Sequence, residues 1–187
     1  MLHYLDIRLL TDPELAPHQL MSHLFSRVHQ RMARGQFTQV AVSFPGYALT
    51  PATLGKTLRL IGPADALTAF MANDWLAALR DHVSLTDLQP VPADAKPYRL
   101  RRVQAKSSPE RLRRRQMRRH GLSAEAARAR IPDQCAERLS LPFVTVPSSS
   151  TGQQFHLFLQ WTPSTEGEQP GHFNAYGLSS QATTPQF

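Results

Sequence analysis

The chain has 187 residues, of which 41% are hydrophobic and 19% are charged, and its formal net charge is +7. This length and composition are typical of one large or two small globular domains and exclude an intrinsically disordered chain. No run of about eighteen apolar residues occurs, so we expect no membrane-spanning helix. The charged start MLHYLDIRLL predicts no signal peptide, and the single Cys135 excludes an internal disulfide and favours the cytoplasm.

The first half of the chain alternates predicted strands and helices. Residues 2–10 read as a half-buried strand, with Asp6 and Arg8 on the face opposite the leucines. A helix is predicted over 11–36, since its apolar residues recur at helical spacing: Leu20, Met21, Leu24, Phe25, Val28 and Met32. Strands over 38–45 and 57–62, a helix over 63–83 and a strand over 83–91 follow. The order β-α-β-β-α-β is the ferredoxin-like pattern.

The second half differs in character and begins after a proline-rich linker at 90–97. It reads as a strand over 98–106, an arginine-rich helix over 107–121 and a short helix over 122–131. Three strands over 141–146, 154–161 and 171–179 complete it. We therefore predict an α+β protein with a ferredoxin-like domain at 1–94 and a second, nucleic-acid-binding domain at 95–187.

The segment SSPERLRRRQMRRHG, residues 107–121, places six arginines in nine positions. Ser107 and Glu110 have capping-box spacing, Pro109 suits a first helical turn and Gly121 suits the exit. Five arginines recur at helical spacing and would cover roughly 140° of one face; they are Arg111, Arg114, Arg115, Arg118 and Arg119. Because like charges at this spacing repel, the helix is expected to meet the phosphates of a nucleic acid.

Charge distribution supports the same partner. Residues 96–138 hold 14 of the 21 Lys and Arg but only four of the 14 acids. An undistorted A-form RNA has a major groove too narrow for side chains, so an RNA target would be a short hairpin, and DNA stays possible on charge alone. On a strand, Arg102 and Gln104 would share a face, and their side chains suit the edges of guanine and adenine. The simpler interpretation is that they are two polar residues on an exposed strand face.

Metal-free acid–base chemistry is the catalytic chemistry that the residues favour. There is no HExxH motif, no CxxC pair and no glycine-rich phosphate loop, so we expect no metal and no cofactor. His29 borders the apolar stripe of the first helix and can serve as a general base. The alternative is a polar edge residue, like His18 and Ser22 on the same side.

Further candidates lie in the last forty residues. Ser148 and Ser150 belong to the hydroxyl-rich segment PSSSTGQ, which is either a plain turn or a site for phosphate or ribose. Tyr176 stands before Gly177 and is either a packing or a site residue. Phe155 falls in an alternating strand and either packs in the core or stacks on a base.

Several segments together resemble one family, the CRISPR repeat-RNA processing endoribonucleases of subtype I-F. They are HYLDIRL, LMSHLFSRVHQ, RVQAKSSPERLRRRQMRRHGLSAEAARARIPD, LPFVTV, SSSTGQQFHLFLQ and YGLSSQATTPQF, and the match covers essentially the whole chain. The resemblance implies a ferredoxin-like domain, an arginine helix in the major groove of the repeat hairpin, and metal-independent cleavage that leaves a 2′,3′-cyclic phosphate. It also implies that the enzyme stays on its product and joins the type I-F interference complex.

The resemblance implies roles for individual residues. His29 would be the base, Ser148 would restrain the attacking ribose and Tyr176 would help order the site. The implied RNA-binding residues are Arg102, Gln104, Arg111, Arg114, Arg115, Arg118, Arg119, His120, Ser150, Thr151 and Phe155. Two positions depart from the family's pattern, namely Pro147 before the serine and Gln186, where tryptophan is usual.

Two other function classes remain open. A non-catalytic RNA-binding module is the second hypothesis, because RNA-recognition motifs share the β-α-β-β-α-β order, but their aromatic strand signature is missing here. The third is a DNA-binding regulator with RLRRRQMRRH as its recognition helix.

Overall fold

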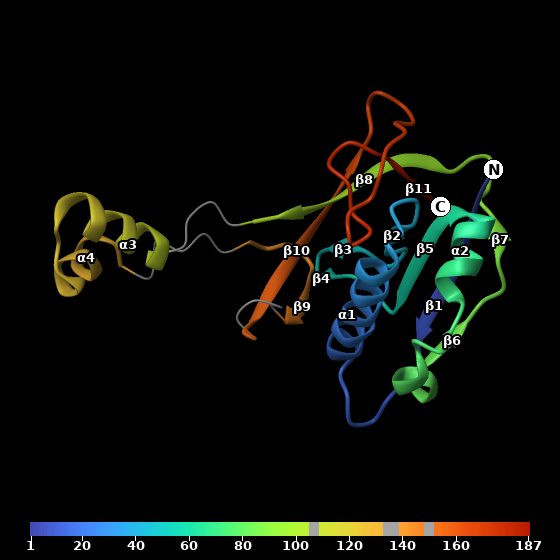
Figure 1. The fold of residues 1–187 in the computed structure, drawn as a ribbon, viewed down its shortest axis with the longest axis horizontal. Helices are drawn as coiled ribbons and strands as arrows, with labels where there is room; N and C mark the ends of the chain where they lie inside the picture. Colours follow the sequence, from blue (N-terminus) through green and yellow to red (C-terminus); the bar gives the residue numbers. More distant parts are fainter. Residues whose placement is uncertain (105–108, 133–138, 148–151) are drawn as a thin grey trace. The chain divides into compact units, whose positions relative to one another are not determined.

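The structure, a computed structural model, describes residues 1–104, 109–132, 139–147 and 152–187 (Figure 1). Two compact units make up this mixed α/β chain. The main unit combines Met1–Arg102 with Leu141–Phe187, and the arginine-helix unit is Val103–Ser140. The division into domains at 1–94 and 95–187 stays a prediction. The boundaries of the compact units differ from those of the predicted domains, because the strands near the C-terminus join the N-terminal part of the chain.

The first sheet of the main unit contains five strands. Its order is β2-β5-β1-β6, with β7 also paired to β1, and β1 pairs antiparallel with β5, β6 and β7, as β2 does with β5. Along the chain, the elements come in the order β1, α1, β2, β5, α2, β6, with a short β3–β4 hairpin between β2 and β5. The strands are β1 (Leu2–Leu9), β2 (Ala41–Ser43), β3 (Ala48–Leu49), β4 (Ala52–Thr53), β5 (Thr57–Pro63), β6 (Val83–Leu85) and β7 (Gln89–Pro90).

Helices α1 (Pro17–Gly35) and α2 (Ala64–Met71) contact each other and the first sheet. The predicted stripe of α1 is confirmed, since all six apolar residues are at most 1% exposed. The single helix predicted over 63–83 is wrong. Asn73 is left-handed (φ 70°), and the chain re-enters a 3₁₀ helix, η1, only at Ala77–His82.

An arginine of α1 explains where α2 stops. Arg31 donates hydrogen bonds to the carbonyls of Phe70 (2.9 Å), Ala69 (2.8 Å) and Ala72 (3.1 Å). These are the carbonyls that a continuing helix would bond to its own backbone. A positive charge at a helix C-terminus is also favourable, because the helix dipole is negative there. The tertiary contact therefore ends a helix that the local sequence would have continued.

The prediction that Asp6 faces solvent is also wrong. Asp6 is 3% exposed, and its carboxylate accepts two hydrogen bonds from Arg59, at 2.7 and 3.1 Å. The Arg59 guanidinium lies over the rings of Tyr4 (4.4 Å) and Phe187 (4.1 Å), and it donates to the Phe187 carbonyl at 3.2 Å. Because its charge is paired and hydrogen-bonded, Asp6 can be buried, while Arg8 on the same face of β1 stays exposed.

The second sheet of the main unit has four strands in the order β11-β8-β10-β9. Strand β9 also contacts α1, so this helix touches both sheets. The strand predicted over 171–179 is wrong, because those residues form turns and loop. The strands are β8 (Lys96–Val103), β9 (Phe143–Pro147), β10 (Gln154–Pro163) and β11 (Thr184–Gln186).

The arginine-helix unit contains α3 (Pro109–His120) and α4 (Ala124–Arg130). The predicted exit of the arginine helix is confirmed, since Gly121 is left-handed (φ 62°) and its N–H bonds to the Met117 carbonyl at 2.9 Å. Ser107, the predicted cap, lies outside the described residues. Ser123 caps α4 by accepting a hydrogen bond from the Ala126 N–H.

Candidate active site and RNA interface

His29 lies on α1 at the border of its buried stripe and is itself half-buried. Its neighbour Val28 and Met32 one turn later are fully packed, so the rotation of the helix is fixed. The imidazole is therefore held at the surface of the core and stays accessible on one side. This is the environment that the sequence predicts.

Two contacts orient the imidazole. Nδ1 of His29 is 2.7 Å from the Ala175 carbonyl oxygen, which only accepts, so the neutral ring carries its proton on Nδ1. The Nε2 lone pair is then free to accept a proton. The Tyr176 ring stacks on the imidazole with centroids 4.0 Å apart and planes 9° apart, and it also lies parallel to Phe25 at 6.2 Å.

A short loop delivers these two contacts. The Asn174 side-chain oxygen accepts from the N–H groups of Tyr176 (2.8 Å) and Leu178 (3.3 Å), so the loop is tied by its own side chain. Gly177 is left-handed (φ 69°), and its carbonyl accepts from the Val42 N–H at 2.9 Å. A Cβ at Gly177 would lie 2.5 Å from Val42 Cγ2, so only glycine lets the loop approach β2 this closely.

Strand β9 runs along α1 in the direction of His29. Phe143, at the start of β9, shares a cavity with Pro17, His18, Met21 and Ser22 in the first turns of the helix. Two residues further on, the Thr145 N–H donates to the Ser22 hydroxyl at 3.0 Å. Ser148, Ser150 and Thr151, the predicted hydroxyl residues after β9, lie outside the described residues.

Arg102 and Phe155 lie together in the second sheet. The Arg102 guanidinium is 5.2 Å from the centre of the Phe155 ring, and the ring is half-buried against the core. Gln104 is exposed but follows the end of β8 at Val103, so the prediction that it shares a strand with Arg102 is wrong. It also belongs to the arginine-helix unit, whereas Arg102 belongs to the main unit.

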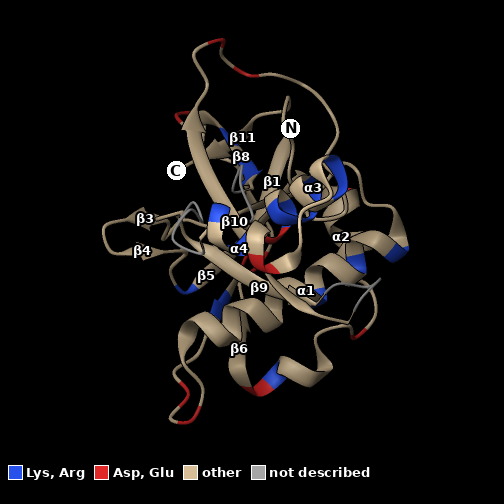
Figure 2. Cartoon of the chain, turned by 90° about the vertical axis from the view of Figure 1, so that its left-hand side faces the viewer, with Lys and Arg blue, Asp and Glu red and all other residues tan. Residues whose placement is uncertain are grey.

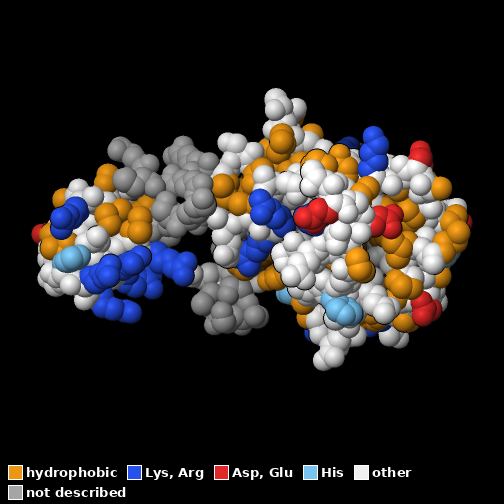
Figure 3. All heavy atoms as spheres, turned by 90° about the horizontal axis from the view of Figure 1, so that it is seen from above, with side chains coloured by type: hydrophobic (Ala, Val, Ile, Leu, Met, Phe, Trp, Pro, Cys, Tyr) orange, Lys and Arg blue, Asp and Glu red, His pale blue; other side chains and the backbone are white. Residues whose placement is uncertain are grey.

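The five arginines predicted to share a face of α3 are all exposed. None of them makes a hydrogen bond or ion pair with any residue that the structure describes. Figure 2 shows the blue segments along α3, and Figure 3 shows Lys and Arg side chains gathered over this unit. His120, the last residue of α3, is exposed as well. The helix thus presents unneutralised charge to solvent.

The sixth arginine of α3 does something different. Arg113 is half-buried, and its guanidinium donates two hydrogen bonds, at 2.8 and 2.6 Å, to the Ile131 carbonyl just after α4. Leu112 and Gln116 are also half-buried, whereas Met117 is 38% exposed. An arginine therefore does part of the packing between α3 and the end of α4.

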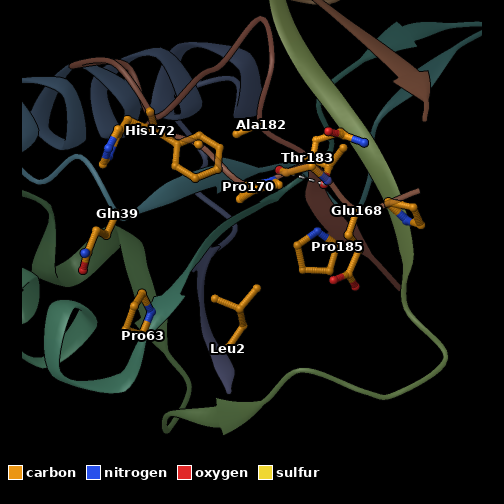
Figure 4. A pocket seen from close by; sticks show the side chains of 13 residues that line it. Leu2, Gln39, Pro63, Glu168, Pro170, His172, Ala182, Thr183 and Pro185 are labelled. Atoms are coloured by element: carbon orange, nitrogen blue, oxygen red, sulfur yellow. Dashed lines mark hydrogen bonds between the residues drawn. The ribbon is translucent and has the colours of Figure 1, made fainter. Parts of the chain in front are cut away.

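No candidate site residue lines the cavity of the main unit that Figure 4 shows. This cavity of about 450 Å³ lies among Leu2, Pro63, Pro97, Phe173 and Pro185, with Glu168 at its rim (Figure 4). In the parts of the chain that the structure describes, no cluster of His, Cys, Asp or Glu has an arrangement that could hold a metal ion. Over the same residues, no helix has the length and apolar character that crossing a membrane requires.

Sequence reasoning missed three parts of the His29 site. The contact of His29 with the Ala175 carbonyl has no local signal, because the two residues are 146 positions apart, and the packing of Tyr176 on Phe25 likewise joins distant parts of the chain. The role of Asn174, in contrast, did have a local signal in the sequence. An asparagine three residues before a glycine is typical of a turn closed by its own side chain.

The chain belongs to a family of CRISPR-associated proteins. The family model described as "CRISPR-associated protein (Cas_Csy4)" matches residues 4–187. Two relatives are each named "CRISPR-associated endonuclease Cas6/Csy4". The one from Pseudomonas aeruginosa (strain UCBPP-PA14) is 50% identical over 186 residues, and the one from Escherichia coli (strain UTI89 / UPEC) is 41% identical over 187 residues. Both alignments cover 99% of each chain.

A solved structure described as "An RAMP protein binding different RNA substrates" covers 98% of this chain and 99% of its own. It is 11% identical, with a TM-score of 0.31.

Proposed function

We propose that this chain is an endoribonuclease that binds the hairpin of a CRISPR repeat RNA and cuts the precursor at the 3′ base of the stem. Its membership of the Cas_Csy4 family and its two relatives named endonucleases support this activity. The observation that carries the chemistry is the hydrogen bond from His29 Nδ1 to the Ala175 carbonyl. That bond leaves Nε2 as the basic nitrogen.

In the proposed reaction, Nε2 of His29 removes the proton of the ribose 2′-hydroxyl. The 2′-oxygen attacks the adjacent phosphorus, the bond from phosphorus to the 5′-oxygen breaks, and that oxygen takes up a proton from the protonated imidazole or from water, so no net proton is consumed. The product is a 2′,3′-cyclic phosphate, and no metal ion takes part. Tyr176 keeps the imidazole in plane by stacking on it, so it positions the base.

Lengths along the chain support Ser148 as the residue that restrains the ribose. Seven helical residues from Ser22 to His29 rise about 10.5 Å. The extended chain from Thr145 to Pro147, the residue before Ser148, covers about 7 Å, and Thr145 is hydrogen-bonded to Ser22. Pro147, the last residue of β9, is exposed at the edge of its sheet, where a missing N–H costs no ladder bond.

Hairpin binding is assigned to α3 and to the end of the second sheet. Five free guanidinium groups at helical spacing can meet phosphates of the stem, and neutralising them removes their mutual repulsion. Arg102 and Phe155 would contact the lowest base pair, the arginine at a guanine edge and the ring by stacking. Gln104, His120, Ser150 and Thr151 complete the proposed RNA contacts.

The remaining parts of the proposal concern architecture and context. We assign residues 1–94 to a ferredoxin-like domain, which the strand order β2-β5-β1-β6 and the two packed helices support. After cleavage the enzyme stays on the hairpin and joins subunits of the type I-F interference complex. The cytoplasmic location stays a prediction.

The test replaces His29 by alanine and measures single-turnover cleavage and binding of a labelled repeat hairpin in excess EDTA. Removing a general base costs about 100- to 10,000-fold in rate, whereas binding through α3 should be unchanged. His23→Ala, at an exposed position of the same helix, is the matched control and should cleave normally. A His29→Ala enzyme that still cuts at the normal rate would refute the assignment. A wild-type protein that binds without cutting would favour a non-catalytic RNA-binding protein.

A 2′-deoxy nucleotide at the scissile position tests the nucleophile. Binding should persist and cleavage should stop, because the attacking oxygen is gone. Chromatography of the wild-type product should show a 2′,3′-cyclic phosphate or the 3′-phosphate formed from it. A 5′-phosphate on the downstream fragment would contradict attack by the 2′-oxygen.

A further inference from the structure

The second sheet has an outer face that the proposed hairpin site does not use. Side chains alternate along β10: Leu157 and Leu159 are fully buried, and Phe155 also faces the core. His156 and Phe158 therefore lie on the opposite face. His156 is exposed and Phe158 is half-buried.

Three aromatic rings form a cluster on this face. Phe143 of β9 stacks on His156 with centroids 4.1 Å apart and planes 24° apart, and it lies 5.3 Å from Phe158. The His156 and Phe158 rings meet edge to face at 6.0 Å. Phe143 is 39% exposed. An exposed aromatic cluster of this kind is typical of a binding surface and not of a core.

The charge of the same face selects a partner. Strands β8, β9 and β10 contain no Asp or Glu, and Arg99 and Arg101 lie on the face of β8 opposite the buried Leu100. Arg101 lies beside the cluster, since its guanidinium donates to the Gln160 side chain at 2.8 Å and Gln160 is two residues after Phe158. Glu166 neutralises Arg99 at 2.9 Å, which leaves Arg101 as the cation next to the rings.

We propose that this face binds unpaired nucleotides of the RNA that flank the hairpin. Bases stack on Phe143, His156 and Phe158, and Arg101 contacts a phosphate. Stacking on aromatic rings combined with arginine is how proteins hold single-stranded RNA without reading its sequence. RNA is favoured over a peptide because each nucleotide brings both a planar base for the rings and a phosphate for Arg101.

The position of the face suits a flank that leaves the cleavage site. From Pro147 back to Phe143, β9 spans about 13 Å, a distance that a few nucleotides cover. The direction of β9 along α1 places its Pro147 end toward the turn that carries His29. This inference rests on the proposed function, because it supposes that a hairpin is already bound.

The test compares three RNAs: the minimal hairpin, the hairpin with an unpaired 5′ extension and the hairpin with an unpaired 3′ extension. Binding is measured on the His29→Ala protein, which cannot consume the RNA. At least one extension should tighten binding by about fivefold or more, as expected for one stacked base. The double variant Phe143→Leu/His156→Ala should remove this gain and leave binding of the minimal hairpin unchanged. Leu49→Ala, at a site 56% exposed in the β3–β4 hairpin, is the control.

A second readout separates stacking from a structural effect. The fluorescence of a 2-aminopurine placed in the favoured extension should be quenched when the RNA binds, and this quenching should be lost in the double variant. The melting temperature of the double variant, and its cleavage of the minimal hairpin when His29 is present, should stay normal. Equal affinity for all three RNAs, or a gain that survives the double variant, would overturn the inference. Failure to bind or cut the minimal hairpin would instead be a failure of the proposed function.

Discussion

Replacing Gly177 by alanine tests whether the loop that holds His29 controls catalysis. The residue is left-handed (φ 69°), a conformation that costs an alanine about 1–2 kcal/mol. The new Cβ would lie 2.5 Å from Val42 Cγ2 and 3.0 Å from Met32 Cε. Overpacking of this kind costs about 1–3 kcal/mol. We therefore expect a loss of about 2–5 kcal/mol in the free energy of unfolding.

The matched control is Gly167→Ala. Gly167 is also left-handed (φ 74°), but nothing lies within 4 Å of its Cβ position, so only the conformational cost applies. Urea unfolding should separate the two variants by about 1–3 kcal/mol.

Single-turnover cleavage should fall about 100-fold in Gly177→Ala alone, because displacing the loop removes the acceptor for Nδ1 of His29. Hairpin affinity should hold in both variants. If Gly177→Ala and Gly167→Ala had the same free energy of unfolding and the same cleavage rate, the close packing at Gly177 could not be the cause of either effect.

Three further outcomes follow from single contacts. Arg31→Ala should lower the free energy of unfolding by about 1–3 kcal/mol in urea, because three carbonyls at the end of α2 lose their donor. The control Arg34→Ala, at an exposed position of the same helix, should change that free energy by less than about 0.5 kcal/mol. Arg115→Ala should lower the slope of log affinity against log salt by about one if it meets one phosphate, and an unchanged slope would contradict groove docking. Asp6→Ala should cost about 3–5 kcal/mol by leaving Arg59 buried and unpaired, and Asp6→Ala/Arg59→Met should recover part of that loss in the same assay.

Local pattern was enough for the parts of the fold that one element decides alone. The apolar stripe of α1 predicted which residues are buried and put His29 at its border. Five arginines at helical spacing predicted the exposed face of α3. In each case the periodicity of the segment is the cause of its placement, so no distant residue was needed.

Two of the failures come from contacts between residues far apart in the chain, and a third comes from a short-range contact. Arg31 ends α2 from another helix, and Arg59 buries Asp6 from the neighbouring strand. The Tyr176 segment reads as a strand because it is apolar and alternating, but Asn174 ties it into a loop. That loop turns the Ala175 carbonyl toward His29, and a main-chain atom leaves no trace in the pattern of side chains.

The arginine-helix unit begins and ends within the chain of the main unit, between β8 and β9. An insertion of this kind can accumulate changes without disturbing the core that surrounds it. Under the proposed assignment, a relative could therefore adapt its α3 to a different stem while keeping His29, Tyr176 and their supporting loop intact. Swapping residues 103–140 between relatives would exploit the same separation to retarget the protein.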